Sequence, residues 1–316
     1  MIHLESAYKG ENEWWKYLLL IAISLLGGQI IGGVFMMIIL AVLSASGGGT
    51  LTAEALSSMD FAAMGVHPTV GLVLLMLPFL ISLLLLVVFF KPLHRRVFTS
   101  VINGWQKVRW QRVITGYGVW ALIMAFFLVV DYYMNIDNYE LRLNWGALIP
   151  LALVSLVLIP FQSFYEEILF RGYLAQGVGR ITHSRWMVII IPSVFFALLH
   201  SMNPEIEKFG FWTMMPQYFM IGAVYALLSV LDDGIELAMG AHAANNTFIS
   251  IFVTADGMAF QTDALLKAQE IDPSKEFVTM LIGSVIFVGA LAFRYKWSWR
   301  VLSKPVEAPE DSSLVA

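Results

Sequence analysis

Eight long apolar stretches restrict what this sequence can fold into. A helix that crosses a bilayer needs about 20 mostly apolar residues, and stretches near or above that length follow one another along the chain. They cover residues 15–44, 69–91, 112–134, 146–178, 187–203, 215–231, 235–255 and 277–294. In lipid the backbone must satisfy its own hydrogen bonds, which a helix does within a single stretch. We therefore predict an all-α fold, a polytopic integral membrane helical bundle with about eight transmembrane helices.

The composition supports a bilayer as the solvent. Hydrophobic residues make up 59% of the chain and charged residues only 13%, whereas a soluble domain has about 25% charged residues. The net charge of −4 gives no sign of nucleic-acid binding. The chain has no cysteine, which excludes disulfides, thiolate nucleophiles and cysteine metal sites.

Basic residues predict the orientation, since they are concentrated in cytoplasmic loops. With both termini cytoplasmic, 15 of the 19 Lys and Arg residues fall on the inner side and 4 on the outer side. We expect four regions. Residues 1–145 form an N-terminal membrane region of about three helices without a recognisable motif, and 146–255 form a core. Residues 256–303 form an outer loop and the last helix, and 304–316 form a disordered tail rich in proline, acids and serine.

Two glutamates and an arginine stand in the fourth apolar stretch, where ionisable groups cost about 2.5–3.5 kcal/mol each. Glu167 and Arg171 are four residues apart in the favourable acid-before-base order, so we expect an ion pair. Glu166 points about 100° away around the helix and has no partner in its own helix. A carboxylate placed in this way can act as a general base on water.

Polar side chains in two further stretches are predicted to reach the same depth. Glu166 lies 17 residues before the loop at His183, and His200 lies 17 residues after it, so an antiparallel hairpin would bring them level. His242 and Asn246 are four residues apart and share one helix face. One cavity can therefore collect all four groups.

These residues resemble three sequence motifs of the CAAX protease and bacteriocin-processing family, which are Glu-Glu-x-x-x-Arg, Phe-x-x-x-His and His-x-x-x-Asn. The matching residues are Glu166-Glu167-x-x-x-Arg171, Phe196-x-x-x-His200 and His242-x-x-x-Asn246. The resemblance covers roughly 146–255, about a third of the chain. It implies an all-helical membrane endopeptidase that acts on a membrane-associated protein or peptide, and it places the chain in a bacterial inner membrane.

The resemblance also implies a role for each motif residue. Glu166 and His200 would activate the attacking water, while His242 and Asn246 would donate to the oxyanion of the tetrahedral intermediate. Glu167 and Arg171 would support this arrangement. No cofactor is expected.

Several alternatives remain open. Asn245 is adjacent to Asn246 and could face the cavity in its place. A zinc-dependent version of the protease would use Glu166, His200 and His242 as ligands, since catalytic zinc takes three protein ligands plus water. The chain could also be a non-catalytic membrane scaffold or chaperone, or a transporter that relays protons through buried Glu and His.

Overall fold

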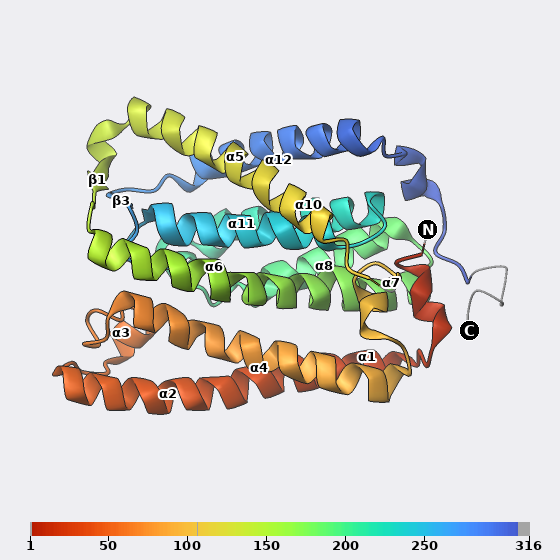
Figure 1. The fold of residues 1–316 in the computed structure, drawn as a ribbon, viewed down its shortest axis with the longest axis horizontal. Helices are drawn as coiled ribbons and strands as arrows, with labels where there is room; N and C mark the ends of the chain where they lie inside the picture. Colours follow the sequence, from red (N-terminus) through yellow and green to blue (C-terminus); the bar gives the residue numbers. More distant parts are fainter. Residues whose placement is uncertain (1, 106, 309–316) are drawn as a thin grey trace.

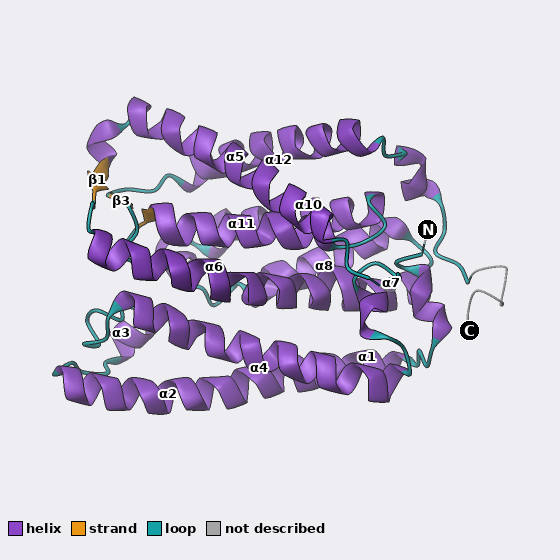
Figure 2. Ribbon diagram, in the orientation of Figure 1, coloured by secondary structure: helices purple, strands orange, loops and turns teal. Residues whose placement is uncertain are grey.

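Eight helices run back and forth along one axis of the structure, a computed structural model that describes residues 2–105 and 107–308 (Figure 1). Each of the eight falls on one of the predicted apolar stretches. The few strand residues lie together at one end of the bundle (Figure 2). The all-α membrane fold predicted from the sequence is confirmed.

Length divides these helices into two groups. In the described part of the chain, six are long and apolar enough to cross a membrane, at Trp14–Gly47, Pro68–His94, Trp110–Met134, Trp145–Thr182, Phe211–Leu231 and Pro273–Tyr295. The other two, α8 and α11, have 15 and 17 residues. At 1.5 Å per residue they extend roughly 23–26 Å, less than a hydrocarbon layer of about 30 Å. The predicted count of about eight thus becomes six full spans and two shorter helices.

The elements are bounded as follows. The longer helices are α1 (Trp14–Ile21), α2 (Gly28–Gly47), α4 (Pro68–His94), α5 (Trp110–Met134), α6 (Trp145–Glu167), α7 (Ala175–Thr182), α8 (Arg185–Leu199), α10 (Phe211–Leu231), α11 (Glu236–Phe252) and α12 (Pro273–Tyr295). Two π-helical segments, Ala22–Gly27 and Ile168–Leu174, make α1–α2 and α6–α7 continuous. The connections contain α3 (Ala53–Ser57), α9 (Pro204–Phe209) and 3-10 turns at Glu5–Lys9, Phe98–Val101, Ile136–Asn138 and Trp299–Ser303.

Three short strands form a small sheet at one end of the bundle, which links the α5–α6 connection to the α11–α12 connection. They are β1 (Tyr139–Leu141), β2 (Val253–Thr254) and β3 (Leu266–Ala268). β3 lies between the other two, antiparallel to β1 and parallel to β2. This small sheet follows α11 directly, at the C-terminal end of that helix.

Glycines let two pairs of helices pack backbone against backbone. A Cβ at Gly32 of α2 would lie 2.4 Å from the Cα of Pro78 on α4. A Cβ at Gly240 of α11 would lie 2.0 Å from the carbonyl oxygen of Val113 on α5. Small residues at such contacts allow membrane helices to approach closely. α11 is held in this way against α5 on one side, and it packs against α6 on the other.

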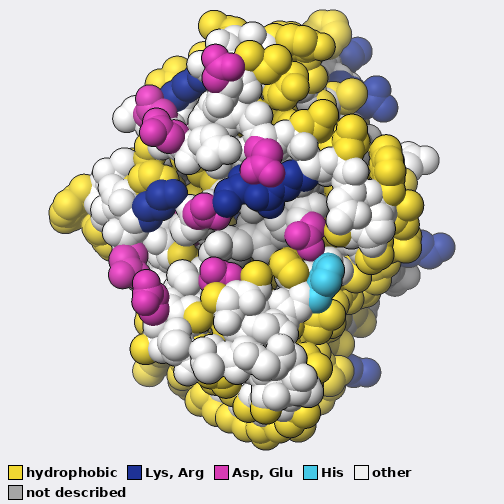
Figure 3. All heavy atoms as spheres, turned by 90° about the vertical axis from the view of Figure 1, so that its left-hand side faces the viewer, with side chains coloured by type: hydrophobic (Ala, Val, Ile, Leu, Met, Phe, Trp, Pro, Cys, Tyr) yellow, Lys and Arg dark blue, Asp and Glu magenta, His cyan; other side chains and the backbone are white. Residues whose placement is uncertain are grey.

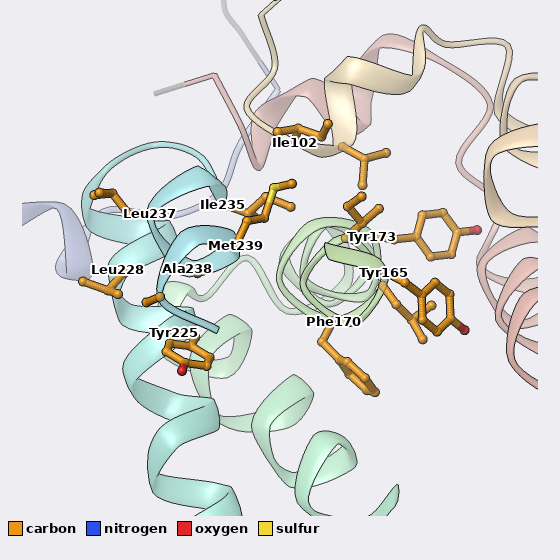
Figure 4. Close-up of a cluster of buried hydrophobic side chains, with 14 of the residues drawn as sticks. Ile102, Tyr165, Phe170, Tyr173, Tyr225, Leu228, Ile235, Leu237, Ala238 and Met239 are labelled. Atoms are coloured by element: carbon orange, nitrogen blue, oxygen red, sulfur yellow. The ribbon is translucent and has the colours of Figure 1, made fainter. Parts of the chain in front are cut away.

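The interior is apolar and centres on α6, α10 and α11. Figure 4 shows part of it, with Tyr165 and Tyr173 from the α6–α7 helix, Tyr225 from α10 and Leu237 from α11. Large apolar side chains on α2, α5 and α12 point outward instead, as a surface in contact with lipid requires. One end of the bundle, seen in Figure 3, carries charged side chains over its middle and hydrophobic ones around its rim. The sides of the bundle are therefore apolar, and the end seen in Figure 3 is polar over its middle.

Both ends of the described chain lie at the opposite end of the bundle (Figure 1). There the Val306 N–H donates to the His183 carbonyl at 3.0 Å, and the Val306 side chain is fully buried. Pro305 pairs with Ser184 in an isolated antiparallel bridge. The packed part of the chain therefore continues at least to Val306, inside the predicted tail, while residues 309–316 of that tail lie outside the described residues.

Candidate functional site

The acidic motif lies at the junction of α6 and the π-helical segment that follows it. Glu167 and Arg171 form the predicted ion pair, with 3.0 Å between Oε1 and Nη1 and both side chains fully buried. Arg171 also donates from Nη2 to the Gly222 carbonyl at 3.1 Å, and its guanidinium lies 4.3 Å from the centre of the Phe196 ring. Through these three contacts Arg171 links Glu167 of α6 to Phe196 of α8 and to Gly222 of α10. π-helical turns often occur at functional sites, and this one places Arg171 beside Glu167.

His242 of α11 lies between the two carboxylates. Its Nδ1 is 2.7 Å from Oε1 of Glu167, and its Nε2 is 3.6 Å from Oε2 of Glu166. The Tyr225 ring stacks on the imidazole with 5.4 Å between centres. Because a carboxylate only accepts hydrogen bonds, Nδ1 carries a proton and donates to Glu167. Glu167 and Tyr225 together hold the ring with Nε2 directed at Glu166.

His200 lies just past the end of α8. Its Nδ1 donates to the Phe196 carbonyl one turn earlier at 2.7 Å, which leaves Nε2 for another partner. The ring stacks on Tyr218 with 4.4 Å between centres. The depth argument predicted that His200 would lie level with Glu166. The histidine that lies against Glu166 in the structure is His242, with 3.6 Å between Nε2 and Oε2.

Gln162 connects the acidic motif to α11, and the sequence argument missed it. Its Nε2 donates to Oε1 of Glu166 at 2.6 Å, and its Oε1 accepts from Nδ2 of Asn246 at 3.0 Å. Gln162 stands one helical turn before Glu166 in an otherwise apolar stretch, a spacing that could have revealed it. Of the two adjacent asparagines, Asn246 is the one that contacts Gln162. Asn245 donates to Oδ1 of Asn246 at 3.0 Å.

A second residue missed from the sequence is Tyr218, which supports His200. Its hydroxyl donates to Oε1 of Glu205, a buried carboxylate near the start of α9. Asn203 donates to the same hydroxyl at 3.0 Å. Oε2 of Glu205 accepts from the Ala259 N–H at 3.1 Å, in the loop that follows α11. The Tyr218 ring that stacks on His200 is thus held by the segment 203–205 before and at the start of α9, and that segment is in turn bonded to the loop at Ala259.

Two carboxylate oxygens in this cluster are buried without a hydrogen-bond partner among the described residues, Oε2 of Glu166 and Oε2 of Glu167. Of the two, Oε2 of Glu166 is the one that faces Nε2 of His242. Burying an unpaired charged acceptor is costly, so such an atom indicates a place where a further molecule binds. Oε2 of Glu166 and Nε2 of His242 are separated by 3.6 Å. A single water at ordinary hydrogen-bond distance can contact both atoms.

The zinc alternative requires three ligands around one point. No group of three or more His, Asp and Glu side chains is placed to hold a metal ion within residues 2–105 and 107–308. Of the three side chains in that alternative, His242 donates from Nδ1 to Glu167 and His200 donates from Nδ1 to the Phe196 carbonyl. Each ring keeps Nε2 as its one nitrogen for a ligand bond. We derive no chemical step through a metal.

The comparisons with known proteins agree with the motif residues. Residues 145–248 match the family model "Type II CAAX prenyl endopeptidase Rce1-like". This segment is Rce1-like. It contains all the motif residues from Glu166 to Asn246, so the resemblance stated from the sequence is confirmed. The chain is also 29% identical over 206 residues to the uncharacterized protein YyaK of Bacillus subtilis (strain 168), an alignment that covers 65% of this chain and 69% of YyaK. No solved structure matches significantly.

Proposed function

We propose that this protein is an intramembrane endopeptidase that hydrolyses a peptide bond in a membrane-associated protein or peptide. The observation that carries the proposal is the buried, unpartnered Oε2 of Glu166, 3.6 Å from Nε2 of His242, within an Rce1-like segment. A carboxylate with one oxygen free and the other fixed by Gln162 is poised to bind and deprotonate a water.

The reaction uses water as the nucleophile. Oε2 of Glu166 takes a proton as the water oxygen adds to the carbonyl carbon, which gives a tetrahedral intermediate with a negatively charged oxygen. Nε2 of His200 is the second contact for this water, as the family resemblance implies. Glu166 then returns the proton to the amide nitrogen, and the C–N bond breaks to give a carboxylic acid and an amine. The acid passes its proton to the amine, and the products leave as a carboxylate and an ammonium group.

Asn246 and His242 stabilise the oxyanion in this proposal. An asparagine N–H donates at any pH. His242 already donates from Nδ1 to Glu167, so it must carry both ring protons if Nε2 is also to donate.

Charge balance supports this state of His242. With His242 protonated, the negative charges of Glu166 and Glu167 are matched by the positive charges of Arg171 and His242, all four of which are buried. Buried charges persist when they are paired. We therefore infer that His242 enters the reaction as an imidazolium.

The proposed setting is a bacterial inner membrane with both termini in the cytoplasm. The basic residues support it, because the topology read from the sequence assigns 15 of the 19 Lys and Arg residues to the side of the termini. The two ends of the described chain lie together at one end of the bundle (Figure 1). The substrate is a peptide segment that reaches the cluster from the membrane or from its cytoplasmic side. The family description names a CAAX prenyl endopeptidase, so prenylated peptides are one substrate class to test.

The test is a comparison of membrane peptides from cells that express the wild-type protein or Glu166→Gln. We expect one or more peptides to be cut only with the wild type, and the same cut to appear with purified protein in liposomes. Metal analysis of the active preparation decides between the water mechanism and a zinc-dependent one. If both strains yield the same peptides while a partner still co-purifies with Glu166→Gln, the protein is a scaffold and the proposal is wrong.

A further inference from the structure

A line of four hydrogen bonds crosses the bundle from α5 to Glu166. The Trp120 indole N–H donates to Oδ1 of Asn245 at 3.3 Å, and Nδ2 of Asn245 donates to Oδ1 of Asn246 at 3.0 Å. Nδ2 of Asn246 donates to Oε1 of Gln162 at 3.0 Å, and Nε2 of Gln162 donates to Oε1 of Glu166 at 2.6 Å. All four bonds point the same way, with every donor on the Trp120 side. This line is called the amide chain below.

We propose that Trp120, Asn245 and Gln162 are positioning residues, which fix the Asn246 amide and the Glu166 carboxylate in their reactive orientations through the amide chain. The proposal rests on the function proposed above, and it assigns roles to three residues outside the family motifs.

The two ends of the amide chain determine its direction. An indole N–H can only donate, and a carboxylate can only accept. Each of the three amides between them offers an oxygen on one side and an NH₂ group on the other. Turning any one amide over would place oxygen against oxygen and NH₂ against NH₂, so two bonds would be lost at once. Trp120 is 2% exposed and Gln162 is 5% exposed, so bulk water does not compensate for a bond lost at these two residues. Asn245 and Asn246 are half-buried.

The direction matters because Asn246 must present an N–H to the oxyanion. Its Oδ1 is occupied by Asn245, and one of its two N–H groups is occupied by Gln162. The second N–H remains for the substrate. In the reversed orientation the carbonyl oxygen would take a place facing the reaction, where it would repel the developing negative charge.

The same chain settles which oxygen of Glu166 reacts. Gln162 holds Oε1 at 2.6 Å, which leaves Oε2 on the side of His242. Asn245 is then not a rival of Asn246 for the cavity, as the sequence left open, but the residue that orients it. Trp120 packs edge-on against Phe287 with 5.1 Å between ring centres. Its indole N–H is the first donor of the amide chain and cannot accept a hydrogen bond.

The first experiment follows the amide chain without measuring activity. Protein labelled with ¹⁵N-tryptophan shows indole N–H resonances, and Trp120→Phe identifies the one from Trp120. Gln162→Met removes two links while keeping side-chain length. We expect the Trp120 resonance to shift in Gln162→Met. The matched control is Gln217→Met, because Gln217 is equally buried and donates instead to the Pro273 carbonyl. An unmoved Trp120 resonance in Gln162→Met, or an equal shift in Gln217→Met, overturns the amide chain.

The second experiment measures cleavage of the peptide identified with wild-type and Glu166→Gln membranes. Trp120→Phe and Gln162→Met should lower kcat by about 10–100-fold with KM unchanged, less than the ~100–1,000-fold loss for a direct oxyanion donor. Gln162→Glu should regain activity as the pH falls, because a protonated carboxyl can donate to Glu166 and accept from Asn246, while Gln162→Met should not regain it.

The outcomes separate the two proposals. Full kcat in Trp120→Phe and Gln162→Met, together with an inactive Glu166→Gln, overturns the positioning roles and leaves the protease intact. Failure to find any peptide that depends on Glu166 defeats the proposed function, and the tryptophan resonances then still decide whether the amide chain exists.

Discussion

Replacing Gly240 by alanine tests whether backbone packing sets the position of His242. The new Cβ would lie 2.0 Å from the Val113 carbonyl oxygen and 2.8 Å from the Tyr117 nitrogen. The first distance falls short of ordinary van der Waals contact, 3.4 Å, by more than 1 Å. Since both neighbours are backbone atoms of α5, α11 must move away from α5. His242 is two residues further along α11 and moves with it.

The expected cost follows from that displacement. A misplacement of about 1 Å in a catalytic group can lower the rate by about 100-fold, so Gly240→Ala should lose about this much of the cleavage rate. Gly116→Ala should behave alike, because its Cβ would lie 2.3 Å from the Leu237 carbonyl oxygen on α11.

Two alanine variants serve as controls. Gly118→Ala lies on α5 where a Cβ meets nothing within 4 Å, and it should keep the wild-type rate. Gly32→Ala forces α2 from α4, far from the cluster, and should lower the melting temperature more than the cleavage rate. The assay is cleavage of the identified peptide by purified protein in liposomes, with thermal unfolding measured in parallel. A Gly240→Ala protein as fast as Gly118→Ala would refute the claim that this contact positions His242.

Three further outcomes are expected. Arg171→Met leaves the Glu167 charge buried without its ion-pair partner, so thermal or denaturant unfolding should show a loss of about 3–5 kcal/mol; an unchanged unfolding midpoint would contradict a structural role for the pair. Asn246→Ala should lower kcat by about 100–1,000-fold while KM changes little, and a pure KM effect would remove it from the oxyanion site. Burial lowers the pKa of the His3 imidazole, although the Asp233 charge opposes this. Because detached His3 then binds more protons than docked His3, docking of residues 2–9 is strongest above the usual histidine pKa of about 6.5 and weakens as the pH falls below it. Hydrogen exchange, corrected for the pH dependence of the intrinsic amide exchange rate, should show weaker protection of this segment near pH 5 than near pH 7.5, and His3→Gln should abolish that difference in protection.

The fold was largely predictable because lipid leaves a long apolar stretch few alternatives to a helix. Each predicted stretch corresponds to one helix, and the boundaries differ by a few residues. The π-helical continuation from α6 into α7 was not predicted, since no pattern of residue types along Ile168–Leu174 distinguishes a π-helical turn from an α-helical one. The strands at 139–141, 253–254 and 266–268 were missed because two or three residues are too short to show an alternating pattern.

The site was predictable where spacing within one helix decides the geometry. The Glu167–Arg171 pair follows from an i, i+4 spacing, and it is present. Contacts between helices were harder to predict. His242 faces Glu166 because α11 lies at a particular height against α5 and α6, and that height depends on glycine contacts such as Gly240 with Val113. No spacing along the chain encodes it. Gln162 was missed because the search for buried ionisable groups does not detect an uncharged amide.

The central claim is that the Glu166 carboxylate activates the water that cuts the substrate. The most direct measurement is the single-turnover cleavage rate of the identified peptide by purified wild-type protein, Glu166→Gln and the control Glu140→Gln, an exposed acid on β1. The glutamine keeps the size of the side chain and removes the base. The mechanism predicts wild-type cleavage by Glu140→Gln and no detectable cleavage by a folded Glu166→Gln protein. Cleavage at the wild-type rate by Glu166→Gln would contradict it.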